Sequence, residues 1–295
     1  MIKRTIEISH RSYLSIKDKQ LIIRQQDRQV GQVPMEDIAV IVLNDPSITM
    51  TQSVMVASQQ NNVALVVCDE KHLPVSTLLP IAEGNRLHNK VLRSQLAIRT
   101  STKKRLWQHI VRHKIGNQAV TLTKAGVNAI PLLAMIEKVK SGDPTNVEAQ
   151  AARYYWKALF GDAFSRDKDE KGVNALLNYG YSIIRAAVGR AIVGTGLHPS
   201  IGLFHQNQYN GLSLADDLME PFRPWIDNKV LAMKRLTSAP AINQDTKRTL
   251  LLTLENKVLY KSKKMPFMVS LGYLAAELKS AHELNLKKLN WPEII

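Results

Sequence analysis

The sequence predicts an α+β protein, with a small β-sheet or sandwich domain over residues 1–80 and a larger all-α domain over residues 81–295. Runs of β-branched residues separated by polar turns extend as far as Pro80. Beyond it, amphipathic stretches with the helical period, rich in Ala, Leu, Lys and Arg, take over. A hydrophobic content of 45% is sufficient for a buried core.

The N-terminal part reads as strands with one helix. Residues 13–16 and 20–24 flank the polar turn Lys17-Asp18-Lys19 and predict a β-hairpin. Further β-branched or extended runs predict strands over residues 38–43, 63–68 and 74–79. A short helix is expected over residues 51–60, after the turn Asn44-Asp45-Pro46-Ser47.

The C-terminal part is predicted to be helical throughout. Apolar residues recur there at three- and four-residue spacing, which places them on one face of a helix. The stretches that fit are residues 87–99, 147–159, 172–193, 214–219, 227–236, 246–258 and 266–284. No internal repeat or low-complexity tract interrupts them.

Charge is the strongest compositional signal. Lys and Arg number 40 against 25 acids, a formal net charge of +15, and no acid occurs from Gly84 to Ile136. A solvated helix face normally mixes signs, because acid–base pairs four residues apart stabilise it. A basic face kept only for solubility remains an alternative, but we predict a surface for DNA phosphates. The residues assigned to it are Arg86, Lys90, Lys103, Lys104 and Arg105.

Other features bound the class of protein. Trp107 could stack on a base, although a core position is favoured. Cys68 is the single cysteine, which excludes an intrachain disulfide, and its apolar surroundings predict a buried, inert thiol. The N-terminus has no apolar signal region, and no apolar stretch approaches the ~20 residues needed to cross a bilayer. The expectation is a cytoplasmic protein without a membrane segment.

Phosphodiester chemistry at neutral pH needs a divalent cation held by carboxylates with an occasional imidazole. Glu148 is a first candidate, because it opens a predicted helix among alanines that leave space around it. The alternative is an acid favoured in the first turn by the helix dipole. His205 is a second candidate, because it lies in a run of amide side chains between glycines that resembles a pocket wall. A lone histidine is more often a satisfied polar group.

The third candidate is a cluster of acids. Asp217 and Glu220 lie three residues apart on one face of a predicted helix, beside Asp216. Acids so crowded repel one another unless a cation joins them. Two alternatives stay open: Ser213 with Asp216 resembles a capping box, and Arg223 could neutralise one of the acids.

The order of these motifs resembles one known family. Glu148 is followed by Leu-Asn-Tyr-Gly-Tyr at residues 177–181, Gly-Thr-Gly-Leu-His-Pro at residues 194–199, His205, and Leu-Met-Glu-Pro-Phe-Arg-Pro at residues 218–224. This pattern is similar to the CRISPR-associated endonuclease and integrase called CRISPR-associated protein one, and its wording is most similar to the type II branch. The resemblance extends over essentially the whole chain, including the β-then-α layout and the basic charge.

The resemblance implies a homodimer whose β domains pack together and whose helical domains each bind Mg²⁺ or Mn²⁺. The catalytic and metal-binding roles of the family's Glu, His and later acid fall on Glu148, His205 and Glu220. Glu220 departs from the Asp of many relatives. Asp217, the acid three residues earlier, is implied as an alternate or supporting ligand.

The resemblance also implies partners and a reaction. The family joins with CRISPR-associated protein two and acts on double-stranded DNA, as the spacer fragment and as the CRISPR repeat. The 3′-hydroxyl of the fragment attacks a phosphodiester at the edge of a repeat, and cleavage by water is the same displacement. A non-catalytic basic DNA-binding protein remains the main alternative. A hydrolase of small phosphoesters is a weaker one, because it leaves the acid-free stretch unexplained.

Overall fold

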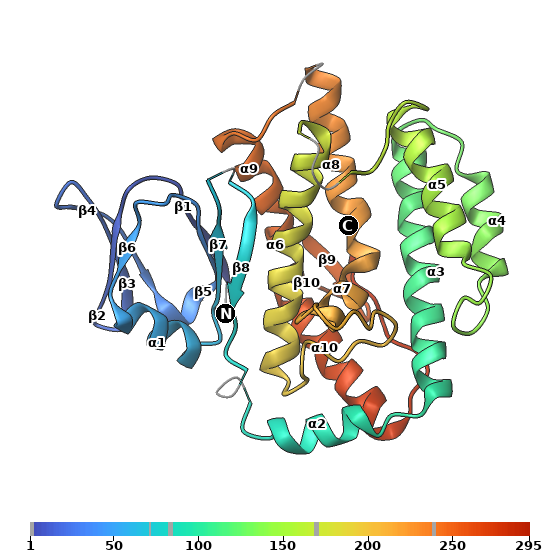
Figure 1. Ribbon diagram of the computed structural model, residues 1–295, viewed down its shortest axis with the longest axis horizontal. Coiled ribbons are helices and arrows are strands. Elements are labelled where there is room, and N and C mark those ends of the chain that lie inside the picture. The colour runs from blue at the N-terminus through green and yellow to red at the C-terminus, as the bar shows by residue number, and fades with distance from the viewer. Residues whose placement is uncertain (1–2, 71, 82–84, 168–170, 238–239) are drawn as a thin grey trace.

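The computed structural model describes residues 3–70, 72–81, 85–167, 171–237 and 240–295. Layers of strands lie beside a larger group of helices (Figure 1), which confirms the predicted α+β class. The N-terminal elements are β1 (Arg4–Ile8), β2 (Tyr13–Lys17), β3 (Gln20–Gln25), β4 (Arg28–Pro34), the 3₁₀ turn η1 (Met35–Asp37), β5 (Ile38–Leu43), β6 (Thr49–Met50), α1 (Gln52–Gln60), β7 (Ala64–Cys68) and β8 (Pro74–Leu78).

Two four-stranded sheets form this part. In one, ordered β1-β5-β7-β8, the first three strands are parallel and β8 is antiparallel. The other has the order β4-β3-β2-β6. All six residues of β5 are buried because both of its faces are covered. Val40 and Val42 join the core shared with the helices, whereas Ile41 and Leu43 join the core under the second sheet and α1.

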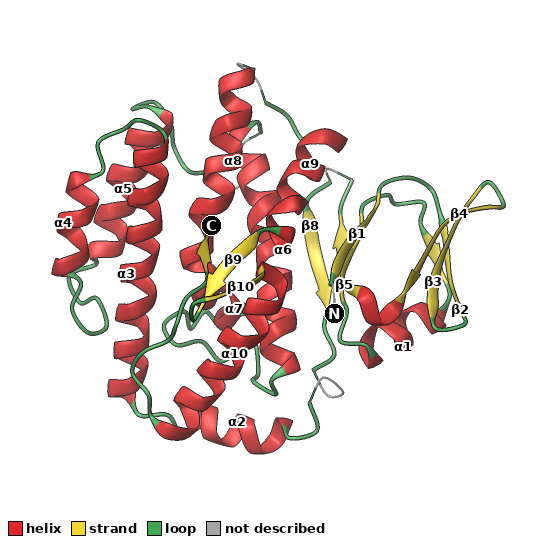
Figure 2. Ribbon diagram, turned by 180° about the vertical axis from the view of Figure 1, so that it is seen from behind, coloured by secondary structure: helices red, strands yellow, loops and turns green. Residues whose placement is uncertain are grey.

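The C-terminal part is built around α6. Its helices are α2 (His88–Leu96), α3 (Thr100–Lys124), α4 (Ile130–Lys138), α5 (Val147–Phe160), α6 (Val173–Gly194), α7 (Ser213–Met219), the 3₁₀ turn η2 (Glu220–Phe222), α8 (Arg223–Leu236), α9 (Gln244–Leu251), the 3₁₀ turn η3 (Leu252–Glu255) and α10 (Phe267–Leu284). Helix α6 packs on β5, β7 and β8 on one side and on α7 to α10 on the other (Figures 1 and 2). Helix α3 packs on α4, α5, α8 and η2.

One predicted helix is wrong over half its length. The helix expected over residues 246–258 ends at Leu251, and β9 (Lys257–Tyr260), β10 (Lys263–Pro266) and β11 (Glu293–Ile294) form a three-stranded sheet. Lys261 and Ser262, at φ of 48° and 63°, make the tight left-handed turn that joins β9 to β10. The C-terminal part is therefore largely rather than wholly helical.

The predicted domain boundary falls in a region with a continuous core. Residues of β5 and β7 belong to the same hydrophobic cluster as α3, α6 and α10, and the boundary after residue 80 stays a prediction. Gly84, where the acid-free stretch begins, lies outside the described residues.

In the part of the chain that the structure describes, no helix combines the length and apolarity needed to cross a membrane. Cys68 is partly buried, and burial raises the pKa of its thiol to about 12, as expected of an inert cysteine.

Candidate active site

Glu148 is placed by a capped helix start. The Asp143 carboxylate accepts hydrogen bonds from the backbone N–H groups of Val147 and Glu148, each at 2.9 Å. Asn146, with φ of 51°, accepts a further hydrogen bond from the backbone of Ala149. Because these two side chains satisfy the first N–H groups of α5, the carboxylate of Glu148 is left to another partner. Glu148 does lie in the first turn of α5, where the helix dipole also favours an acid.

His205 lies on the loop between α6 and α7 and is held by Asp217. The wholly buried Asp217 accepts hydrogen bonds from three backbone N–H groups of residues 203–205, at 2.6, 3.0 and 3.2 Å. Its Oδ1 also lies 2.6 Å from Nδ1 of His205. A Cβ on Gly202 would lie 2.3 Å from the carbonyl oxygen of His205, so this close approach requires glycine. Asp217 therefore orients the imidazole.

The same loop is attached to α3 through aromatic rings. Phe204 stacks on Trp107 with ring centroids 4.3 Å apart, and the ring of His205 meets Trp107 edge-on at 5.7 Å. Trp107 is 1% exposed. The core position favoured for Trp107 is confirmed, and the alternative of stacking on a base is wrong because Phe204 covers the ring.

Asp216 closes the base of the loop. Its carboxylate pairs with the Arg185 guanidinium through contacts of 2.6 and 3.0 Å, and Asn210 donates to it at 2.6 Å. Ser213 donates to the carbonyl of Asn210 at 3.0 Å. The residue preceding α7, Leu212, makes no side-chain cap. The capping-box interpretation of Ser213 with Asp216 is therefore wrong.

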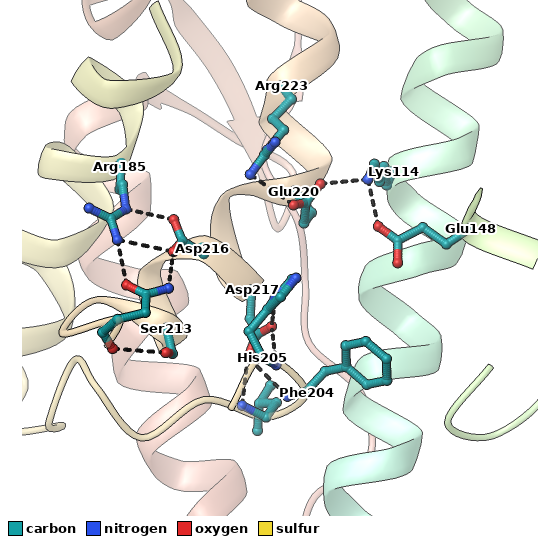
Figure 3. A network of polar contacts seen from close by, with 12 residues as sticks. Lys114, Glu148, Arg185, Phe204, His205, Ser213, Asp216, Asp217, Glu220 and Arg223 are labelled. Atoms are coloured by element: carbon teal, nitrogen blue, oxygen red, sulfur yellow. Dashed lines mark hydrogen bonds and ion pairs between the residues drawn. The ribbon is translucent and has the colours of Figure 1, made fainter. Parts of the chain in front are cut away.

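Lys114 joins the two acids that come from distant parts of the chain. Its Nζ lies 2.6 Å from Oε1 of Glu148 and 2.6 Å from Oε2 of Glu220, and Figure 3 shows it between them. The other oxygen of Glu220 lies 3.0 Å from a guanidinium nitrogen of Arg223, as one of the sequence alternatives proposed. Two carboxylates and two cations thus meet where α3, α5 and η2 adjoin.

The charges of this group support one another. Burial by itself raises the pKa of Glu220, but Arg223 and Lys114 outweigh it and lower that pKa. Burial lowers the pKa of Lys114, and the charges of Glu220 and Glu148 more than compensate, so the ammonium stays protonated. The hydrogen bond that Asp217 accepts from the ring of His205 raises the pKa of this imidazole against the effect of burial, and the charges of Glu220 and Glu148 act in the same direction.

The donors suit a hard divalent cation. Oε2 of Glu220 is buried, and the Lys114 ammonium lies 2.6 Å from it. A positive charge already lies between the two carboxylates, and His205, with Nδ1 engaged by Asp217, keeps Nε2 for a ligand. Within the described residues, however, no three His, Cys, Asp or Glu side chains are close enough to form a ready metal site. Glu148 and Glu220 share Lys114 as a partner, whereas His205 is bound to Asp217 and is affected by the two acids only through their charges.

The predicted DNA-contact residues lie on α2, the turn before it and the start of α3. Arg86, Lys90, Lys104 and Arg105 are exposed and Lys103 is partly exposed. Their contact with DNA stays a prediction. Lys114 belongs to the same acid-free stretch, yet its side chain is only 13% exposed and serves the site instead.

Beside the site, α8 carries a buried carboxyl group, that of Asp227, whose ionisation lowers the stability of the fold. Asp227 accepts hydrogen bonds from Tyr155, at 2.8 Å, and from Tyr181. Burial raises the pKa of Asp227 to about 7, although both tyrosines act to lower it. Because the folded pKa lies above the unfolded one, ionisation opposes folding, and stability should fall as the pH rises from about 4 to about 7.

Asp227→Asn is expected to remove this pH dependence. Relative to the variant, the wild-type protein should lose about 3 kcal/mol of unfolding free energy between pH 4 and pH 7. Urea denaturation at several pH values measures the difference. Parallel pH profiles for the two proteins would show that Asp227 does not ionise in this range.

The site is typical of an enzyme that acts on phosphodiester bonds, because its donors suit a hard cation and the net charge of +15 on the chain suits a polyanionic substrate. The model of the family described as CRISPR associated protein Cas1 matches residues 7–258. The chain therefore belongs to the Cas1 family, the endonucleases and integrases of CRISPR adaptation. Membership decides against the alternative of a non-catalytic DNA-binding protein.

A relative agrees with this assignment, and solved structures share the fold. The CRISPR-associated endonuclease Cas1 of Neisseria meningitidis is 37% identical over 299 residues, which cover 100% of this chain and 97% of that protein. It is a type II-C protein, so the predicted resemblance to the type II branch is confirmed. A casposase bound to an integration product has a TM-score of 0.77 at 20% identity, covering 98% of this chain and 92% of that one. A chain of a Cas6-RT-Cas1–Cas2 complex has a TM-score of 0.80 at 18% identity, and the match covers 99% of this chain and 36% of that one.

Proposed function

We propose that this protein inserts short DNA fragments into a CRISPR array by metal-dependent transesterification, with Glu148, His205 and Glu220 as catalytic and metal-binding residues. The observation that carries the proposal is the convergence of Glu148 and Glu220, 72 positions apart in the sequence, on one ammonium group. The carboxylate of Glu220 is buried and that of Glu148 is partly buried, and two such carboxylates that meet at one point repel each other unless a positive charge lies between them.

Each residue has a distinct part. Glu148, Glu220 and Nε2 of His205 would hold Mg²⁺ or Mn²⁺, the cations that oxygen and imidazole donors accept. When bound, the cation neutralises charge on the scissile phosphate and favours attack by an oxygen nucleophile. Asp217 supports the site indirectly, because it fixes the imidazole through Nδ1. It is thus assigned as a supporting residue.

Two cationic side chains near the acids, those of Arg223 and Lys114, also contribute to this function. Arg223 neutralises one oxygen of Glu220 and therefore limits the repulsion between the two carboxylates. Lys114 keeps the carboxylates together in the metal-free protein. Both cations are also suited to the negative charge of a phosphodiester that approaches the site.

The partners follow from the family and its solved assemblies. We propose double-stranded DNA, as the incoming fragment and as the repeat, and a complex with CRISPR-associated protein two. Relatives have been solved in a Cas1–Cas2 complex and with integrated DNA. We further propose a homodimer formed through the β domain of residues 1–80, acting in the cytoplasm. The exposed cations Arg86, Lys90, Lys104 and Arg105, with Lys103, would supply part of the phosphate track.

Metal dependence gives the first test. The wild-type protein, mixed with CRISPR-associated protein two and a repeat-containing plasmid, should join a labelled DNA fragment to the plasmid in Mg²⁺ or Mn²⁺ and lose this activity in EDTA. Calcium, which takes oxygen ligands in more flexible geometry, serves as the control ion. Joining of equal rate in EDTA would refute a metal-dependent mechanism.

A further inference from the structure

A basic pocket of about 340 Å³ lies between α3 and the chain that follows α10. That chain returns along α3, because Asn285 contacts Thr102 at 3.3 Å and the ring of Trp291 lies 5.5 Å from that of His113. The pocket is lined by Arg105, Gln108, His109, Arg112, Lys287 and Lys288. Four of these side chains are cations and none is an acid.

The pocket is separate from the candidate active site. Arg105, His109 and Arg112 are spaced by four and three residues and so share one face of α3. Lys114 lies nine residues beyond Arg105, about two and a half helical turns, which places it on the opposite face. An anion bound in the pocket would therefore be separated from Glu148 and Glu220 by the body of the helix.

Two polar atoms at the pocket have no partner within the protein. Nδ1 of His109 and Nε of Arg112 are buried and make no hydrogen bond to the described residues. The ion pair between Arg112 and Glu137 is long, at 3.8 Å, and the Glu137 side chain is 81% exposed, so it contributes little. Unpaired buried polar atoms are costly. An acceptor that enters the pocket would relieve this cost.

The electrostatics of the pocket also favour an anion. Burial lowers the pKa of His109, and the charges of Lys288 and Arg112 lower it further. Guanidinium groups match the oxygens of a phosphate in geometry as well as in charge. Every residue that lines the pocket carries a polar or charged group.

We propose that this pocket binds a backbone phosphate of DNA, as an anchor point across α3 from the residues that carry the chemistry. The inference rests on the proposed function for the identity of the polyanion. It assigns Lys287 and Lys288, at the end of the chain, to the DNA-binding surface together with Arg112 and His109. The anchor affects how tightly DNA is held, whereas the metal site affects whether strands are joined.

The test compares two double variants in EDTA, where no strand joining occurs. Arg112→Gln with Lys288→Gln should weaken binding of a short fluorescent DNA duplex about tenfold at moderate salt and should reduce the slope of log K against log salt by about 1 to 2. Lys263→Gln with Lys264→Gln, on β10, removes the same charge from exposed positions and should change binding much less. Binding of Mn²⁺, measured separately without EDTA, should be the same in both variants.

Three outcomes would overturn the proposal. One is equal DNA affinity and salt slope for the two double variants. Another is loss of Mn²⁺ binding in the pocket variant, because the pocket would then not be separate from the metal site. The third is tight binding of inorganic phosphate that DNA does not displace, which would indicate a small-anion site. If Arg112→Gln lowers the melting temperature, Lys287→Gln with Lys288→Gln, both exposed, replaces it. If the wild-type protein binds DNA through the pocket but joins no strands, the proposed function is refuted and the proposal for the pocket is retained.

Discussion

Glu148→Ala is expected to abolish insertion of a DNA fragment into a repeat-containing plasmid, with a loss of about a thousandfold or more. The variant removes one of the two carboxylates that meet at Lys114 and leaves Glu220 with Lys114 and Arg223 as its counter-ions. The reaction would then lack a donor for the cation that neutralises the phosphate. His205→Ala should have an effect of the same order, because it removes the imidazole that Asp217 orients.

The measurement is plasmid integration with CRISPR-associated protein two and Mg²⁺ or Mn²⁺, combined with DNA binding by anisotropy. Binding should remain close to that of the wild-type protein, because neither side chain belongs to the proposed phosphate track. Glu283→Ala, an exposed acid on α10, is the matched control and should keep its activity. Unaltered integration by either purified site variant would refute the assignment of that residue.

Lys114→Met should have the second largest effect, on stability in the absence of metal. Glu148 and Glu220 would then face each other with only Arg223 to compensate, and loss of a buried counter-ion costs about 3 kcal/mol of unfolding free energy. A divalent cation should restore more stability to this variant than to the wild-type protein, because it meets two carboxylates without a competing ammonium.

Urea denaturation in EDTA and in Mn²⁺ measures both effects. Lys124→Met, an exposed lysine in the last turn of the same helix, is the control and should shift stability little. A loss of equal size with and without Mn²⁺ would contradict the idea that Lys114 and the metal compete for the same carboxylates. Absence of any loss in EDTA would show that the ion pairs contribute nothing to folding.

Local signals predicted the elements that depend on local physics. Hydrophobic alternation and turn residues predicted both ends of β5 correctly, and the ends of β2 and β3 to within one residue. The hairpin of β9 and β10 was missed, because the turn of Lys261 and Ser262 adopts a left-handed backbone without glycine, asparagine or aspartate. The helix before it was extended too far for the same reason. Helix α3 was also missed as a single element, although Thr100 to Lys124 carries both Lys114 and the basic pocket.

The site was predicted through its acids and its histidine but not through its cation. Lys114 lies three or four residues from Ile110, Val111 and Gln118, all of which are buried. A lysine on the apolar face of a helix was therefore the available signal, and the run of cations around it concealed that signal. Asp217 was assigned a ligand role as an alternative, whereas its contacts with residues 203–205 explain its complete burial.

The sequence by itself determined the β-then-α layout, the basic charge and the family, because each can be recognised from composition, periodicity or an ordered set of motifs. Only the tertiary structure decided which charges meet. Lys114 from α3, Glu148 from α5 and Glu220 from η2 are distant in sequence, and their pairing depends on how three helical elements pack. Periodicity along a helix specifies the face on which a residue lies, but the packing of the whole chain determines what that face contacts.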